Sequence, residues 1–168
     1  MFALCSCGRV SLGLRWAPIQ GWRIWIRWSL IIGLLVGFAI TIGAGLILAT
    51  AREIPIITLS PRQLPGRILT VCVSAPLQEE TLYRVIVCVP VVASFGKWPA
   101  VAVSRVLFGA LHFLHGNPSP ENLVGGWFIA WAYLKSETVV IPLLLHNVGN
   151  LLVLLGQLAT WYFLITVR

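Results

Sequence analysis

Residues 67–95 read RILTVCVSAPLQEETLYRVIVCVPVVASF. This run is long enough to cross a bilayer as a helix, which requires roughly 20 apolar residues. It is interrupted by Glu79, Glu80 and Arg84. Insertion scales assign about 2.5–3.5 kcal/mol to one charged side chain at the bilayer centre, so three unpaired charges would cost roughly 7–10 kcal/mol. A cluster this unfavourable in an apolar helix indicates a functional site.

The composition of the whole chain fits the same environment. Of the 168 residues, 58% are hydrophobic and 10% are charged, whereas soluble domains carry about 25% charged residues. We therefore expect an all-α integral membrane protein, a polytopic bundle of about five hydrophobic helices. The other expected helices lie at 28–51, 99–115, 122–134 and 138–166.

Two parts of the chain differ in character. Residues 1–27 are basic and rich in tryptophan, which predicts a segment at the membrane–water interface and a cytoplasmic N-terminus. Residues 28–168 form the predicted membrane-embedded domain, with a core at about 67–160. The net charge of +7 is explained by arginines that flank the spans and meet anionic headgroups. Membrane lipids are thus expected partners, and nucleic acid is not.

Helical geometry places Glu79 on a different face of the helix from Glu80 and Arg84. Glu80 and Arg84 are four residues apart, so they lie on one helix face and can form an ion pair. Glu79 is rotated by about 100° from Glu80, because a helix has 3.6 residues per turn. Pro76 removes a backbone donor and predicts a kink or a local opening of the helix. Glu79 is therefore the carboxylate that remains available for chemistry.

Polar residues with helical spacing recur in two later apolar segments. His112 follows Phe108 by four residues, and Asn150 follows His146 by four. His115 is expected to be only a helix-end residue. Ionisable residues within membrane helices normally face the bundle interior or a watered cavity.

A glutamate, two histidines and an asparagine suffice for hydrolysis by water. A carboxylate can deprotonate water, a histidine can orient that water or protonate a leaving amine, and a second histidine with an amide can donate to an oxyanion. Alternatively, Glu79, His112 and His146 match a zinc set that leaves one position open for water. We expect no cofactor, with zinc as the alternative, because Asn150 is a poor zinc ligand and a good oxyanion donor.

The order of these motifs resembles the CPBP family of intramembrane proteases, also called the CAAX prenyl protease or Abi family. The resemblance covers about residues 69–155. It rests on three motifs in sequence, namely Glu79-Glu80-x-x-x-Arg84, Phe108-x-x-x-His112 and His146-x-x-x-Asn150. Where family members often have Phe and Gly, this chain has Tyr83 and Val85.

The resemblance implies an activity and a role for each motif residue. The protein would be a multi-pass endopeptidase, expected in a bacterial plasma membrane, that cleaves membrane-associated peptide or protein substrates. Glu79 would activate water with His112, and His146 would line the oxyanion site with Asn150. Glu80 and Arg84 would be structural partners. Family members have been described both as metalloproteases and as glutamic proteases without metal.

A second class of function stays open from the residues alone. A non-catalytic membrane scaffold, such as a bacteriocin-immunity protein, or a small proton-coupled carrier could also hold intramembrane Glu and His. Carriers often show repeated halves, and the sequence contains no repeat. Convergence of Glu79, His112, His146 and Asn150 in one cavity would favour the peptidase.

Overall fold

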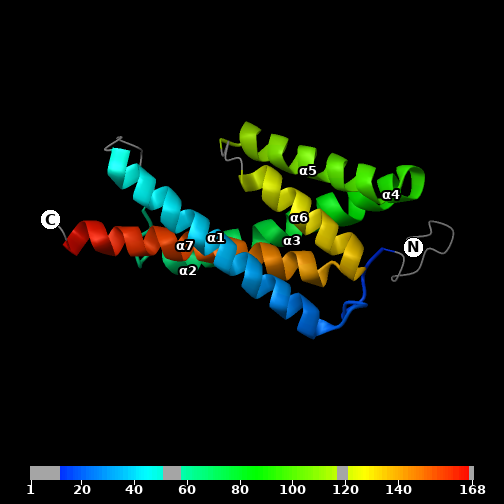
Figure 1. The fold of residues 1–168 in the computed structure, drawn as a ribbon, viewed down its shortest axis with the longest axis horizontal. Helices are drawn as coiled ribbons and strands as arrows, with labels where there is room; N and C mark the ends of the chain where they lie inside the picture. Colours follow the sequence, from blue (N-terminus) through cyan, green and yellow to red (C-terminus); the bar gives the residue numbers. More distant parts are fainter. Residues whose placement is uncertain (1–11, 51–57, 117–120, 167–168) are drawn as a thin grey trace. The chain divides into compact units, whose positions relative to one another are not determined.

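The computed structural model describes residues 12–50, 58–116 and 121–166. Most residues of these ranges are helical. The β-bridge found within them is the isolated pairing of Leu14 with Thr138. The all-α class is therefore confirmed. The elements shown in Figure 1 are α1 (Trp22–Thr50), α2 (Leu64–Arg67), η1 (Ile68–Ser74), α3 (Ala75–Glu80), η2 (Thr81–Cys88), α4 (Val89–Phe95), α5 (Lys97–Leu114), α6 (Glu121–Ser136) and α7 (Val140–Thr166).

The elements from α2 to α4 follow one another without a break, so the described chain contains five continuous helical stretches. Each corresponds to one of the five expected from the sequence. Among the described residues, one segment, Val140–Phe163 in α7, is long and apolar enough to cross a membrane by length and composition. The interfacial character of 1–27 stays a prediction; residues 1–11 lie outside the described part, and α1 begins at Trp22.

Two π-helical stretches, η1 and η2, flank the short helix α3 that carries Glu79 and Glu80. At the first junction the N–H of Ala75 donates to the carbonyl of Thr70, five residues back. Pro76 follows and has no N–H to donate. The local opening predicted at Pro76 thus takes the form of wider, π-helical turns. Such turns are rare in proteins, and many of those that occur lie at functional sites.

The chain divides into two compact units, and the first comprises Met1–Trp22 and Pro76–His146. In this unit α5 and α6 lie side by side and pack against α4 and η2 (Figure 1). The contact between α5 and α6 depends on small residues. A Cβ at Gly109 would stand 2.3 Å from Leu123, and one at Gly126 would stand 3.1 Å from the ring of Phe108.

The segment that precedes α1 is bound to the connection between α6 and α7. The hydroxyl of Tyr133 donates to the carbonyl of Leu12 at 2.7 Å, and the N–H of Val139 donates to the carbonyl of Gly13 at 2.8 Å. Gly13 has φ +66°, and a Cβ there would meet the Tyr133 ring at 2.8 Å. Glycine is therefore required at position 13. The two hydrogen bonds hold the segment before α1 against the end of α6 and the residue that precedes α7.

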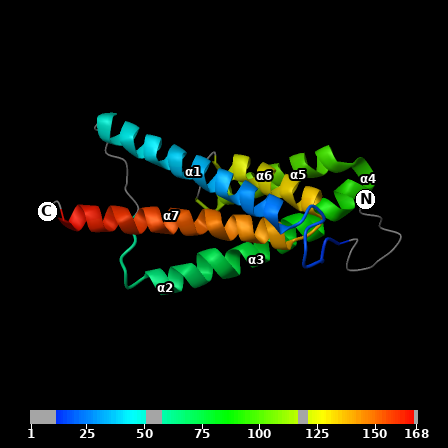
Figure 2. The same cartoon turned by 60° about the horizontal axis from the view of Figure 1, so that its bottom comes forward.

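The second unit comprises Arg23–Ala75 and Asn147–Arg168. Here α2 and η1 run along the later part of α7 (Figure 2), and Leu59, Cys72 and Leu154 form a buried cluster between them. The N–H of Leu59 donates to the carbonyl of Gln157 at 3.3 Å. Apolar packing and a backbone hydrogen bond thus hold α7 to the start of the long helical stretch.

Candidate active site

A fully buried polar cluster lies at the centre of the first unit. Glu80 and Arg84 each have 0% exposed surface. The Nε of Arg84 donates to Oε2 of Glu80 at 2.6 Å, and its Nη2 donates to Oε1 at 3.3 Å. The Nη1 of Arg84 donates to the hydroxyl of Ser104 on α5. The ion pair expected from the i,i+4 spacing is therefore present.

The same carboxylate also holds one of the site histidines. The Nδ1 of His146 on α7 lies 2.8 Å from Oε1 of Glu80. An ionised carboxylate only accepts hydrogen bonds, so the proton of this bond belongs to the imidazole. We call Glu80, Arg84, Ser104 and His146 the polar hub. No spacing in the sequence predicts the bond from His146 to Glu80 or the contribution of Ser104.

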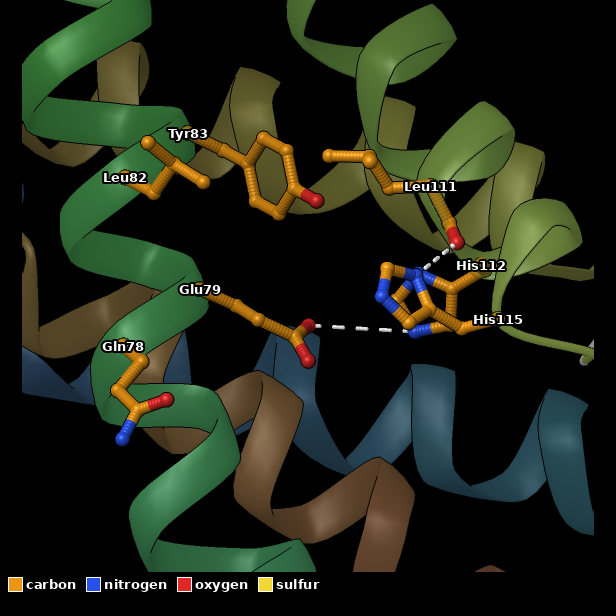
Figure 3. A pocket seen from close by; sticks show the side chains of 7 residues that line it. All are labelled: Gln78, Glu79, Leu82, Tyr83, Leu111, His112 and His115. Carbon is orange, nitrogen blue, oxygen red and sulfur yellow. Dashed lines mark hydrogen bonds and ion pairs between the residues drawn. The ribbon is translucent and has the colours of Figure 1, made fainter.

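Glu79 has quite different surroundings from Glu80. Its Oε2 lies 3.9 Å from Nε2 of His112 (Figure 3) and 3.8 Å from Nε2 of His146. Both separations exceed the usual hydrogen-bond length of about 2.7–3.2 Å. This oxygen is buried and accepts no hydrogen bond from the described residues. Three groups predicted to act together, from α3, α5 and α7, thus converge without bonding one another directly.

The hydrogen bonds behind the two imidazoles fix how they face Glu79. The Nδ1 of His112 lies 2.9 Å from the carbonyl of Phe108, and a carbonyl can only accept. Each ring therefore carries a proton on Nδ1, and Nε2 is the nitrogen nearer to Oε2 of Glu79. In a neutral ring Nε2 accepts a hydrogen bond, and in a protonated ring it donates one.

Phe108 positions both imidazoles. Its ring stacks on His112 with centroids 4.3 Å apart and meets the ring of His146 edge-on at 5.7 Å. It also meets Tyr83 edge-on at 5.2 Å, and it is 4% exposed. Phe108 is therefore the apolar support of the site.

A cleft of about 350 Å³ opens on Glu79 and His112 (Figure 3). Its lining includes three polar residues outside the predicted set, namely Gln78, Tyr83 and His115. His115 follows His112 by three residues, a spacing that brings side chains to the same helix face. From this spacing the sequence could have predicted that His115 lies at the same cleft as His112. The remaining lining residues are Leu82 and Leu111.

Asn150 lies in the second unit, one helical turn after His146 on α7. Its Nδ2 donates to the carbonyl of Val71 at 2.7 Å. A side-chain amide nitrogen has two N–H groups, so one remains for another acceptor. The oxyanion role of Asn150 stays a prediction.

The alternative zinc ligands, Glu79, His112 and His146, lie too far apart for tetrahedral coordination. Zinc bonds of about 2.0–2.1 Å place two ligand atoms about 3.4 Å apart, whereas Oε2 of Glu79 is 3.9 and 3.8 Å from the two Nε2 atoms. Within the described ranges no group of three His, Cys, Asp or Glu side chains is arranged to hold a metal ion. The present arrangement of Glu79, His112 and His146 does not fit zinc.

Fold and site together define an all-helical protein in which a glutamate and two histidines face one another beside a cleft. Residues 61–152 match the family described as type II CAAX prenyl endopeptidase Rce1-like. The match spans more than half of the chain, so the protein belongs to this family of membrane-embedded endopeptidases and the resemblance seen in the sequence is confirmed. Neither a curated protein nor a solved structure matches the chain.

Proposed function

We propose that the protein is a multi-pass intramembrane endopeptidase that hydrolyses peptide bonds of membrane-associated proteins at the Glu79 cleft. The observation that supports this proposal most directly is the convergence of Glu79, His112 and His146. A non-catalytic scaffold does not require a carboxylate oxygen that faces two imidazoles beside a cleft, and the sequence lacks the repeated halves that are common in carriers. Family membership supports the same class of reaction.

Water activation follows from the spacing in the site. Two atoms 3.8–3.9 Å apart can share one water that bonds to each at about 2.8 Å. Glu79 accepts a proton from this water while Nε2 of His112 orients it. The water oxygen forms a bond to the substrate carbonyl carbon, and the C=O electron pair moves to the carbonyl oxygen. General base catalysis of this kind contributes about 10²–10⁴-fold to a rate.

His146 is the proposed donor to the resulting oxyanion. Because its Nδ1–H is engaged by Glu80, its Nε2 can donate only when the ring carries a second proton. The buried Glu80 carboxylate stabilises that imidazolium and leaves Arg84 paired as well. Asn150 is the proposed second donor, through its amide N–H. Donors placed in advance where negative charge develops commonly contribute 10²–10³-fold.

Collapse of the tetrahedral intermediate completes the reaction. The C–N bond breaks, and the nitrogen takes the proton that Glu79 received from the water, directly or by way of His112. One water is consumed, and a carboxylic acid and an amine are released, which become a carboxylate and an ammonium when the proton passes from the acid to the amine. Atoms and charge balance in this scheme. We propose a glutamic rather than a metal-dependent peptidase because Oε2 of Glu79 lies farther from the two Nε2 atoms than two ligands of one zinc ion would.

Metal analysis of the purified active protein tests that choice. We expect less than stoichiometric zinc and an activity that chelators do not change. Stoichiometric zinc that is lost together with activity on chelation, and restored by zinc, would contradict the glutamic mechanism.

The proposed function itself is tested by comparing membrane proteomes of cells that express the wild type or the Glu79→Ala variant. We expect at least one membrane-associated protein to accumulate uncleaved in the variant. The matched control is Gln78→Ala, which changes the adjacent cleft residue without removing a titratable group. Identical proteomes for wild type and Glu79→Ala, with both proteins folded, would refute the peptidase and favour a scaffold or carrier.

A further inference from the structure

A second cleft lies in the first unit, away from the predicted catalytic residues. It has a volume of about 210 Å³ and lies where α5 begins and α6 ends. Its lining consists of two lysines, two tryptophans and two aliphatic residues: Lys97, Trp98, Val101, Trp131, Leu134 and Lys135. No motif of the sequence analysis and no step of the proposed reaction uses it.

Lys97 and Lys135 are the two lysines of the whole chain; the other ten basic residues are arginines. Both are exposed. In the described part of the chain neither forms an ion pair or a side-chain hydrogen bond, although the backbone carbonyl of Lys135 accepts from Gln20. The two lysines of the chain therefore meet at one cleft, and no acidic side chain among the described residues pairs with either.

Helix electrostatics accounts for one lysine and not for the other. Lys135 lies in the last turn of α6, where the helix dipole favours a cation. Lys97 is the first residue of α5, where the dipole disfavours a cation, and the first turn of α5 has neither an acidic residue nor a side-chain cap. Another source of negative charge would explain a lysine at this position.

The cleft is layered from apolar to charged. Val101 and Leu134 are 3% and 5% exposed and form its floor. Trp131 is half-buried, whereas Trp98 is 67% exposed. Indole rings settle at the headgroup level of a membrane, and basic pockets between membrane helices bind anionic lipid headgroups. The layering therefore matches an amphipathic ligand better than a small ion.

We propose that this lysine cleft binds the phosphate group of an anionic phospholipid. The two ammonium groups contact the phosphate oxygens, and the glycerol and the first acyl carbons lie against the indoles and the aliphatic floor. Inorganic phosphate offers the same charge without an apolar part, so it would leave the floor uncovered. Binding of this lipid is independent of the proposed peptidase activity.

Lysine footprinting tests the proposal on the full chain in neutral detergent. An amine-acylating reagent modifies Lys97 and Lys135, and mass spectrometry gives the rate at each site, with the terminal amine as internal reference. We expect phosphatidylglycerol to slow acylation at both lysines, and phosphatidylcholine or inorganic phosphate at equal concentration to leave the rates unchanged. Equal protection by phosphatidylcholine would overturn the proposal, and equal protection by inorganic phosphate would overturn the lipid assignment.

Binding measured by native mass spectrometry gives the second readout. Each Lys→Gln variant should bind phosphatidylglycerol about fivefold more weakly, and Lys97→Gln/Lys135→Gln roughly thirtyfold more weakly. Lys97→Arg/Lys135→Arg keeps both charges and should bind within about twofold of the wild type, which also guards against a misfolded Gln variant.

The control for general charge loss is Arg62→Gln/Arg67→Gln. These two arginines line a different cleft, in the second unit. They carry the same total charge as the lysine pair, and we expect their loss to leave footprinting protection of the lysines unchanged. An equal loss of protection in this control, or unchanged lipid affinity in Lys97→Gln/Lys135→Gln, would show that the lysine cleft is not the site. Protection by an acidic peptide and not by lipid would also refute it.

Discussion

Glu79 and Glu80 are consecutive residues of α3, yet their carboxylates differ in almost every physical respect. Glu80 is fully buried, and its oxygens accept hydrogen bonds from Arg84 and His146. The side chain of Glu79 is 27% exposed, and its Oε2 accepts none from the described residues. A carboxylate whose hydrogen bonds are complete holds other groups in place, whereas one that faces two imidazoles at a distance can take up a proton.

Removal of the Glu80 carboxylate should unfold much of the protein. Glu80→Ala leaves the guanidinium of Arg84 buried and unpaired, and breaking a buried ion pair in this way costs about 3–5 kcal/mol. We expect the free energy of unfolding, measured by denaturant titration in detergent, to fall by that amount. Gln78→Ala on the same helix is the control and should change it little. If Glu80→Ala were as stable as the wild type, the structural role assigned to Glu80 but not to Glu79 would be contradicted.

Glu79→Gln should have the opposite profile. The amide keeps the size of the side chain but cannot act as a base at neutral pH, so the rate of substrate cleavage should fall by about 10²–10⁴-fold. Stability should be unchanged or slightly higher, because no hydrogen bond to Oε2 is lost. The measurement pairs initial cleavage rates with denaturant unfolding. Full activity in Glu79→Gln would remove Glu79 from the mechanism.

Substitution of the two histidines should affect stability to different extents, because His146 bonds to the buried Glu80 and His112 does not. His146→Gln disrupts a hydrogen bond to a buried charge, which contributes about 1.5–3 kcal/mol, and it also removes the proposed oxyanion donor. His112→Gln loses a bond to a backbone carbonyl, so its stability should change by about 1 kcal/mol. Both variants should lose activity. If His112→Gln destabilised the protein as much as His146→Gln, His112 would contribute to stability like a member of the polar hub, and the distinction between the two histidines would be wrong.

Ser104→Ala should have the smallest effect and should act on stability alone. Its hydroxyl accepts from Nη1 of Arg84, and loss of a hydrogen bond to a charged group costs about 1.5–3 kcal/mol, less where water or a neighbouring group replaces it. We expect cleavage rates within about twofold of the wild type and a measurable loss in unfolding free energy. Ser104→Thr keeps the hydroxyl and is the matched control. A loss of activity in Ser104→Ala without a loss of stability would place Ser104 in the reaction.

The sequence predicted what depends on local periodicity. Apolar runs gave the helices, and the spacing of Glu80 and Arg84 gave their ion pair, because both follow from 3.6 residues per turn. The bond between Glu80 and His146 joins residues 66 positions apart, and no helical period relates such positions. Ser104 was missed for the same reason, since one serine in an apolar helix carries no signal of its partner.

The lysine cleft was missed because Lys97 and Lys135 begin and end different helices, so only the packing of α5 on α6 brings them together. The π-helical turns around α3 were anticipated only as an opening at Pro76. Their extent depends on hydrogen bonds made along the whole stretch, and a single proline does not specify it.

Substitution of Gly126, which has no side chain, should disturb the site through the ring of Phe108. A methyl group there would stand 3.1 Å from the ring of Phe108, and Phe108 is the ring on which His112 stacks. Any larger residue at this position of α6 would press on the support of the imidazoles while leaving every proton-transferring group in place. A mutational scan for activity should therefore register position 126 as intolerant, and the glycine counts among the residues that position the proposed site.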